Sequence, residues 1–541
     1  MNILKIHPLD NIIVALQNIT KDTSLKIDNQ TIILKSDVTA KHKFAAQDFN
    51  IGESIIMYGA LMGKATRPIA QGEVITIHNV THDAADFTTK QKVYNWSPPD
   101  LTAFKDKTFL GYHRADGQVG TMNIWLIIPL VFCENRNVTV LHDALIQELG
   151  YARANLYQNL VRNLKNNTLT NISTPTTHSD LLYPNRHFKN IDGIKVLTHQ
   201  GGCGGIRQDS ETLCGLLAGY VNHPNCAGAT ILSLGCQNAQ VDIFKRELAR
   251  RNPHFNKPLI MVDQQASGTE ENLLQEAINE TFKGLAQADN ITRTPAPVAK
   301  LNIGVKCGGS DGFSGISANP AMGFTADLLC GLGGSVVLAE FPELCGQEQE
   351  LLNRCVNHDI ADKFAILQRT YAQRARAVGS GFDMNPSPGN IRDGLITDAM
   401  KSAGAAKKGG TSPVNDVLDY PEWVQKAGLN LLCTPGNDVE CTTAMTAAYT
   451  NLIIFSTGLG TPTGNPLCPV IKVSTNTTLA QHMADIIDFN TGKIITGEKN
   501  IEEMGSDLLD YCIDVASGVA IPKAVLLEQD DFIPWKRGVS L

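Results

Sequence analysis

The first 92 residues follow a pattern of hydrophobic and polar positions that is typical of short β-strands. β-branched and apolar residues alternate or run together over residues 2–16, 30–34 and 55–58, and glycines at turn spacing separate these runs. No stripe of apolar residues at helical spacing occurs in this part of the sequence. The pattern predicts a small β module over residues 1–92.

Two proline-containing segments mark changes in this pattern. Trp96-Ser97-Pro98-Pro99-Asp100 contains two prolines beside turn-forming residues, and the next convincing strand begins only after Phe109. A second such segment lies at Thr292–Pro297. We therefore predict a linker over 93–107 and a domain boundary between residues 291 and 298.

From residue 108 onward, apolar strand-like runs alternate with helix-like segments, which is typical of helices layered on a mostly parallel sheet. We predict an α/β middle domain over 108–291 and a C-terminal α/β, Rossmann-like domain over 298–541. The polar stretch 166–184 predicts a surface insertion. The predicted strands are 124–131, 193–198, 230–234, 301–307, 335–341, 428–434, 452–456 and 470–473, and the predicted helices include 213–220, 241–250, 351–357 and 364–378.

Composition narrows the class of protein. The 541 residues are 43% hydrophobic and 18% charged, with a formal net charge of -8 and no basic block, which argues against a nucleic-acid partner. No apolar run approaches the roughly 18 residues that cross a membrane, and residues 1–8 do not resemble a signal peptide. Thirteen cysteines without a C-x-x-C pair then predict reduced thiols in a cytoplasmic protein.

Polar, glycine-containing turns follow several predicted strands, where open α/β sheets collect their ligands. One turn contains His199 and Cys203, a second contains Cys236, and Glu340 follows a third strand. Imidazole, thiolate and carboxylate groups are metal ligands. Each turn also has a plain reading, as a loop with a buried cysteine, a satisfied histidine or a solvated acid.

The turn Lys306–Gly315 combines a lysine, a serine and an aspartate with several glycines. Its backbone N–H groups could bind a carboxylate or hydroxyls beside the Lys306 charge. The same residues form a literal G-x-S-x-G around Ser310, but Gly315 and Pro320 are expected to interrupt the helix that a nucleophile elbow requires. The glycines at 458–464 have the wrong spacing for a dinucleotide loop.

These turns resemble, in the same order, motifs of the altronate/galactarate dehydratase family, including its N-terminal SAF (β-clip) module. The resemblance covers nearly the whole chain and rests on several long segments. They are 6–11, 42–45, 58–59, 62–63, 72–73, 78–80, 111–120, 306–319, 386–390 and 434–436.

The resemblance implies a hydro-lyase that removes water from a sugar acid, D-altronate, to give 2-dehydro-3-deoxy-D-gluconate by metal-assisted α,β-elimination. It also implies a small-molecule partner, a homodimer and a divalent metal, with Fe²⁺ preferred over Mn²⁺. A galactarate dehydratase, a non-catalytic sugar-acid-binding protein, a lactone hydrolase using Ser310 and an iron–sulfur dehydratase using Cys203, Cys236 and Cys307 are the alternatives.

The resemblance also implies roles for individual residues. Metal ligands are expected at His199, Cys203, Cys236 and Glu340, and catalytic groups at His199, Lys306 and Glu340. Substrate-binding groups are expected at Ser310, Asp311, Asn390, His42 and His78.

Three features depart from the family pattern. Gln237 stands where many members have Glu, residues 398–400 lack a paired acid, and the insertion at 166–184 is unusual. The β module could act as a lid over the substrate or could mediate assembly.

Overall fold

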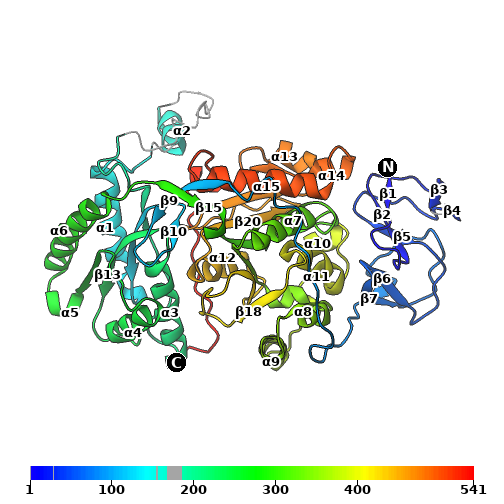
Figure 1. Cartoon of the computed structure of the whole chain (residues 1–541), viewed down its shortest axis with the longest axis horizontal. Helices are drawn as coiled ribbons and strands as arrows, with labels where there is room; N and C mark the ends of the chain where they lie inside the picture. Colours follow the sequence, from blue (N-terminus) through cyan, green and yellow to red (C-terminus); the bar gives the residue numbers. More distant parts are fainter. Residues whose placement is uncertain (1, 28–29, 154–155, 167–184, 541) are drawn as a thin grey trace. The chain divides into compact units, whose positions relative to one another are not determined.

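The computed structural model describes residues 2–27, 30–153, 156–166 and 185–540. The chain forms two compact units, one of Met1–Leu110 with Pro295–Val525 and one of Gly111–Thr294 with Leu526–Leu541 (Figure 1). Apart from Asn166, the predicted insertion at 166–184 lies outside the described residues.

The β module at the N-terminus consists of short antiparallel strands, as its pattern predicted. The run 2–16 holds two strands rather than one, because the chain turns at His7–Asp10 and pairs Ile3 with Ala15. The strands form three small sheets: β1 (Ile3–Leu4), β2 (Ile12–Ala15) and β5 (Lys43–Ala45); β3 (Ser24–Ile27) and β4 (Gln30–Ile33); β6 (Ser54–Met57), β7 (Ala60–Ala65) and β8 (Val80–Thr81).

The β module shares a hydrophobic core with the C-terminal part of its own unit. Ile12, Val14 and Ile55 of the module pack in one cluster with Phe313 and Met400. Polar contacts add to this core, since Lys41 Nζ lies 3.0 Å from Asp311 Oδ2 and Lys43 Nζ donates to the Gly394 carbonyl at 2.8 Å. The module is therefore an integral part of this unit.

The first unit is built on a seven-stranded parallel sheet, so the predicted Rossmann-like fold with a mostly parallel sheet is confirmed. Its order is β18-β19-β17-β16-β20-β21-β22. From β16 the chain continues to β17 on one side, whereas β20 lies on the other side and continues to β21. The connections thus diverge between β16 and β20, which is where open α/β sheets bind ligands. The strands are β16 (Asn302–Cys307), β17 (Ser335–Leu338), β18 (Val414–Leu418), β19 (Gly428–Leu432), β20 (Leu452–Thr457), β21 (Val470–Ser474) and β22 (Phe489–Asn490).

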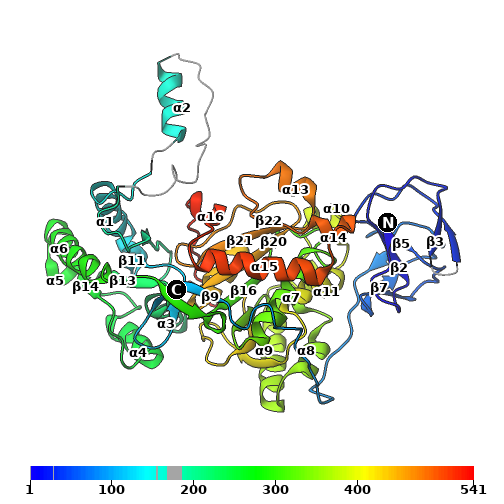
Figure 2. The ribbon, with the colours of Figure 1, turned by 45° about the horizontal axis from the view of Figure 1, so that its top comes forward.

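Helices cover this sheet, and α7 (Ala318–Gly331) packs on four of its strands while α15 (Ile501–Ala516) packs on α7 (Figure 2). The expectation that Pro320 interrupts this helix was wrong, because Pro320 occupies the first turn, where a missing N–H costs no hydrogen bond. The other elements are η3 (Val298–Lys300), η4 (Phe341–Leu344), α8 (Glu348–Arg354), α9 (His358–Ala377), η5 (Phe382–Met384), α10 (Pro388–Arg392), α11 (Asp398–Ala406), η6 (Lys407–Gly409), α12 (Asp438–Ala447), α13 (Thr477–His482), α14 (Gly492–Thr496) and α16 (Lys523–Leu526).

The second unit contains a four-stranded parallel sheet with helices, in the order β12-β11-β13-β14. Its elements are β11 (Ile124–Pro129), η1 (Phe132–Glu134), α1 (Asn135–Glu148), α2 (Leu156–Lys165), β12 (Gly193–Val196), α3 (Arg207–Asn222), β13 (Cys226–Ser233), α4 (Val241–Arg251), β14 (Leu259–Asp263), α5 (Gln264–Ser267) and α6 (Glu270–Ala288). A further three-stranded sheet has the order β10 (Val119–Gly120), β9 (Thr108–His113) and β15 (Thr294–Pro297).

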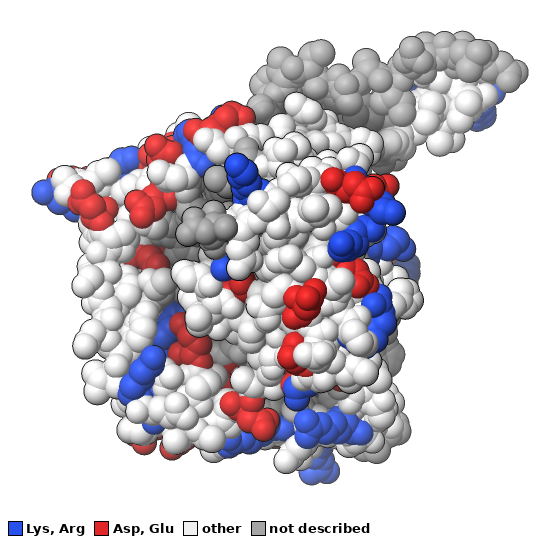
Figure 3. All heavy atoms as spheres, turned by 90° about the vertical axis from the view of Figure 1, so that its right-hand side faces the viewer, with Lys and Arg blue, Asp and Glu red and all other residues white. Residues whose placement is uncertain are grey.

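The surface and the helices agree with the bulk properties. On the face shown in Figure 3, acidic and basic side chains are interspersed without a continuous basic patch among the described residues. In the described part of the chain, none of the helices is both long and apolar enough to cross a membrane. All thirteen cysteines are free thiols, as predicted.

Candidate functional site

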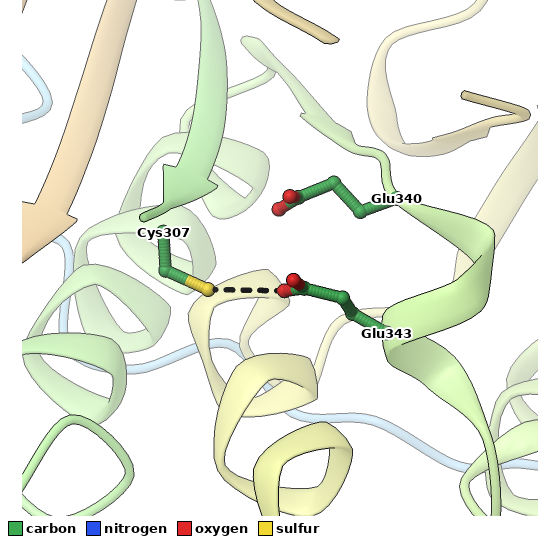
Figure 4. Close-up of side chains that lie close together, drawn as sticks. All are labelled: Cys307, Glu340 and Glu343. Atoms are coloured by element: carbon green, nitrogen blue, oxygen red, sulfur yellow. Dashed lines mark hydrogen bonds between the residues drawn. The ribbon is translucent and has the colours of Figure 1, made fainter. Parts of the chain in front are cut away.

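Three buried side chains meet at the carboxyl end of the seven-stranded sheet (Figure 4). Cys307 is the last residue of β16, Glu340 follows β17, and Glu343 lies in η4. One ligand atom of each lies within 4.8 Å of the others, and the Cys307 thiol donates to Glu343 Oε2 at 3.5 Å. Among the described residues, this is the one group of three such side chains close enough to hold a metal ion.

The backbone at Glu340 brings both carboxylates to the cysteine. Glu340 has φ 71° and ψ 62°, a left-handed conformation that is rare for residues other than glycine. Its N–H donates to Thr434 Oγ1 at 3.0 Å, and the Phe341 N–H donates to the Thr434 carbonyl at 3.2 Å. The end of neighbouring strand β19 therefore holds the turn that carries Glu340 and Glu343.

Three buried lysines surround the acids. Lys306 Nζ donates to Glu340 Oε1 and to the backbone carbonyl of the next residue, Cys307. It also lies 2.8 Å from Asp438 Oδ1. Since an ammonium has three N–H groups, Lys306 is fully engaged as a fixed cation. Lys408 of η6 lies 3.1 Å from Glu340 Oε2 and donates to Cys307 Sγ at 3.2 Å.

The third lysine is Lys401 of α11. Its Nζ lies 2.8 Å from Glu343 Oε1 and donates to Asn385 Oδ1 at 2.8 Å. Lys306, Lys401 and Lys408 thus offset the charges of Glu340, Glu343 and Asp438.

Burial and these ion pairs set the proton affinities. Burial acts to raise the pKa of Glu343, but Lys401, Lys306 and Lys408 outweigh it and hold that pKa at about 2. Burial, with the nearby Glu343 charge, raises the pKa of Glu340. Burial also raises the pKa of the Cys307 thiol to about 11, against the opposing effect of Lys408.

The cluster reaches the surface through Asp438, the first residue of α12. Its side chain is 29% exposed, whereas those of Lys306 and Glu340 are fully buried. Ser310 Oγ and Asn385 Nδ2 are among the buried polar atoms that lack a hydrogen-bond partner in the described part of the chain, and Asn385 Oδ1 accepts from Lys401. Buried polar atoms in proteins are normally paired, so these two are candidates for binding a ligand.

The predicted substrate-binding residues Ser310, Asp311 and Asn390 also gather near this strand end. Asn390 Nδ2 donates to the Ser310 carbonyl at 2.7 Å. Asp311 is buried and accepts from Thr475 Oγ1 at 3.0 Å, besides pairing with Lys41. Asp311 and the Asn390 amide group are therefore engaged within the protein, whereas Ser310 Oγ is available.

The two predicted histidines of the β module differ in their surroundings. His42 is half-buried, its Nε2 lies 3.0 Å from the Arg392 carbonyl, and burial lowers its pKa. His78 is exposed on the module. A role in substrate binding for either histidine stays a prediction.

His199, Cys203 and Cys236 belong to the second unit. His199 is buried, its Nε2 lies 2.7 Å from the Pro129 carbonyl, and its Nδ1 accepts from the Gly201 N–H. Burial lowers the pKa of His199 to about 4, so its ring is neutral at pH 7. Cys203 and Cys236 are exposed on two turns that are joined where the Gly202 carbonyl accepts two N–H groups of residues 238–239. Their role as metal ligands stays a prediction.

Gln237 folds back into its own turn. Its Oε1 accepts from the Gly235 N–H at 2.7 Å, and its Nε2 donates to Ser233 Oγ at 2.8 Å. The amide that stands where many relatives carry Glu is thus occupied by local hydrogen bonds.

The buried Cys307, Glu340 and Glu343 group fits a divalent metal ion. Thiolate sulfur and carboxylate oxygen are both ligand types that divalent metals take in proteins. The sequence interpretation included Glu340 and Lys306 in the site but missed the roles of Glu343, Lys401 and Lys408. A second glutamate three residues after a strand-end glutamate was the available signal for Glu343.

Comparisons with known proteins agree with this architecture. Three family models match the chain: the altronate/galactarate dehydratase SAF domain over residues 1–83, the second domain of D-galactarate dehydratase/altronate hydrolase over 111–289, and the C-terminal domain of D-galactarate/altronate dehydratase over 298–540.

Three relatives match almost from end to end. Altronate dehydratases of Bacillus subtilis and Escherichia coli are each 33% identical to this chain, over 99% and 100% of both sequences, respectively. Galactarate dehydratase (L-threo-forming) of Escherichia coli is 28% identical over 95% of this chain and 92% of its own. The chain therefore belongs to the altronate/galactarate dehydratase family and is a hydro-lyase.

Proposed function

We propose that this protein dehydrates a sugar acid at the strand-end cluster, with D-altronate as substrate and 2-dehydro-3-deoxy-D-gluconate as product. The observation that carries the choice of substrate is the end-to-end identity of 33% to two altronate dehydratases, against 28% to a galactarate dehydratase. Galactarate is the second candidate on the same ground.

The reaction removes the proton at C2 and the hydroxyl at C3, which leaves as water, and the resulting enol tautomerises to the 2-keto acid. Removal of the C2 proton places a second negative charge beside the carboxylate, so the site must supply positive charge and a base. The fixed ammonium of Lys306 and the ammonium of Lys408 supply the charge from the protein. Glu340 Oε2, which lies 3.1 Å from Lys408 Nζ but has no hydrogen-bond partner among the described residues, is our choice for the base.

The charge of the cluster favours an anionic substrate. Three lysines and three carboxylates cancel in the structure as it stands. A divalent ion bound with a Cys307 thiolate would leave one net positive charge, and the carboxylate of a monobasic sugar acid would neutralise it. Buried charges that are compensated cost much less than isolated ones, so a carboxylate ligand completes this site.

A bound Fe²⁺ or Mn²⁺ ion would supply Lewis acidity that spreads the charge developing on the substrate carboxylate. Cys307, Glu340 and Glu343 are the residues that would hold it. Ser310 Oγ and Asn385 Nδ2, two buried atoms without a hydrogen-bond partner among the described residues, would orient substrate hydroxyls. The free thiols throughout the chain fit a reducing cytoplasm.

The test is dehydration by protein prepared anaerobically with Fe²⁺ and presented with D-altronate, galactarate and D-gluconate. We expect the 2-keto-3-deoxy acid from D-altronate at the highest kcat/KM, and loss of activity in Glu340→Gln. The matched control is Glu280→Gln, whose exposed partner is Lys283 on α6. Full activity of Glu340→Gln would exclude this cluster as the catalytic site. A higher kcat/KM of the wild type for galactarate would make galactarate, rather than D-altronate, the substrate.

A second set of variants tests the donors predicted in the other unit. His199→Ala and Cys203→Ala, prepared in the same way, should lose activity if those side chains take part in catalysis. If both keep full activity, the catalytic residues are confined to the Cys307 cluster.

A further inference from the structure

A separate cleft of about 510 Å³ lies in the first unit beside the end of η4. Residues 82–87, which follow the last strand of the β module, β8, form one wall, and the C-terminal half of α9 forms another. Cys345 and Gly346, directly after η4, also line it. The cleft is as large as typical small-molecule sites, and the donors Cys307, Glu340 and Glu343 are not among its lining residues.

Gln368 of α9 is one of the residues that line this cleft, and its side chain has an unpaired acceptor. The side chain is 1% exposed, and its Nε2 donates at 3.1 Å to both the Phe341 carbonyl and Glu348 Oε1. Gln368 Oε1 has no hydrogen-bond partner within the described part of the chain. Because a buried acceptor without a partner is unfavourable, a ligand that donates a hydroxyl here would bind favourably.

The edge of the cleft offers a guanidinium for a carboxylate. Arg376 lines the cleft and is exposed, and it has no ion pair among the described residues. The other cleft arginine, Arg369, is already engaged, since it donates to the carbonyls of Phe87 and Thr88. A guanidinium binds a carboxylate through two parallel hydrogen bonds. The lining also holds Asp83, Asp86 and Glu348, of which Asp83 pairs with Lys64 and Glu348 accepts from Gln368. The unengaged guanidinium and the buried hydroxyl acceptor together fit a hydroxylated carboxylic acid.

The same glutamine connects the cleft to the catalytic cluster. Gln368 holds the carbonyl of Phe341, the residue that follows Glu340. Hydrogen bonds in a chain polarise one another, so a donor bound at Gln368 Oε1 strengthens the bond from Nε2 to Phe341. An occupant of the cleft would therefore help to fix the turn that carries Glu340 and Glu343.

We propose that this cleft is a binding site for a hydroxylated carboxylate, held at its carboxylate by Arg376 and at a hydroxyl by Gln368 Oε1. The choice of sugar acids as probes rests on the proposed function. The site itself rests on the cleft, the unpaired amide oxygen and the unengaged arginine.

The test uses the Mn²⁺-loaded full chain and isothermal titration with 2-dehydro-3-deoxy-D-gluconate, which the forward reaction does not consume. We expect Arg376→Gln to weaken binding about tenfold or more, since it removes a charge-assisted bidentate contact. Arg374→Gln, on the same helix but outside the lining of the cleft, is the matched control and should bind as the wild type does. Equal affinity of Arg376→Gln and wild type would overturn the proposal.

A second comparison tests the hydroxyl acceptor. The wild type should bind the product more tightly than hexanoate, which has a carboxylate but no hydroxyls. In Gln368→Met the ratio of these two affinities should be smaller. An unchanged preference in Gln368→Met would also overturn the proposal. If the wild type fails to dehydrate D-altronate but Arg376→Gln still weakens product binding, the proposed function fails and the cleft stands. If dehydration is found and both cleft variants bind normally, only the cleft fails.

Discussion

Glu343 forms a buried ion pair with Lys401, and variants of this pair can distinguish a structural role of Glu343 from a role in holding a metal. Their side chains are 2% and 9% exposed, and their charged atoms lie 2.8 Å apart. Removing one partner of such a pair leaves an uncompensated buried charge and typically costs about 3–5 kcal/mol. We therefore expect Glu343→Gln and Lys401→Met each to lower the free energy of unfolding by about that amount.

The double variant Glu343→Gln/Lys401→Met removes both charges at nearly constant volume. Neither charge is then isolated. The double variant should therefore lose less free energy of unfolding than the two single variants lose together, by about 0.5–3 kcal/mol, the usual coupling of contacting residues. Activity should not return with stability, because the carboxylate that would bind metal is still absent. Mn²⁺ affinity of the double variant should be lower than that of the wild type by more than about tenfold, since even outer-shell changes cost that much.

Urea titration of metal-free protein measures the stabilities. The decrease of the electron paramagnetic resonance signal of free Mn²⁺ measures metal binding. The matched control is Glu280→Gln/Lys283→Met, an exposed pair on α6 that should contribute less than about 1 kcal/mol. If the double variant at 343 and 401 recovers both stability and activity, Glu343 is structural only and the three-donor site is refuted.

Three further predictions follow from the same structure. Cys307→Ser should weaken Mn²⁺ binding while leaving the fold intact, and an unchanged metal titration would remove Cys307 from the donor set. A chain lacking residues 1–92 should aggregate on size-exclusion chromatography, because it exposes the core shared with Phe313 and Met400; a monodisperse, active product would show that the module is dispensable. Burial raises the pKa of Asp488 to about 6 from 3.8, so the folded state binds this proton more tightly and stability should fall by roughly 3 kcal/mol as the pH rises from 4 to 6. Asp488→Asn should lack that fall in urea titrations, and the same pH dependence in both proteins would contradict the assignment.

The sequence predicted the elements of the α/β sheets well because buried parallel strands are continuous apolar runs. The predicted strand 301–307 is β16, and 452–456 is β20. Residue pattern also located the strand ends at which ligands gather, which is why Lys306 and Glu340 were found. By contrast, the pattern does not say which surface covers an apolar face, so the core shared by the β module and Phe313 was not predicted.

The ligand partners were harder to predict than the strands. Lys408 lies 101 residues after Cys307 in sequence, yet their side chains are 3.2 Å apart. That contact depends on how η6 packs against the sheet, and no local pattern around Lys408 indicates it. His199 lies in a glycine-rich turn, and its ring nitrogens contact the Pro129 carbonyl and the Gly201 N–H, so its role as a metal ligand stays a prediction.

The left-handed turn at Glu340 explains why this site forms from residues that look ordinary in sequence. A non-glycine residue in this conformation costs on the order of 1–3 kcal/mol and persists only when its surroundings impose it. Here Thr434, at the end of β19, binds the N–H groups of both Glu340 and Phe341. The turn directs two carboxylates at Cys307, where the lysines compensate their charge. The strained backbone at Glu340, its hydrogen bonds to Thr434 and the buried lysines therefore act as one arrangement, which holds two carboxylates beside a thiol.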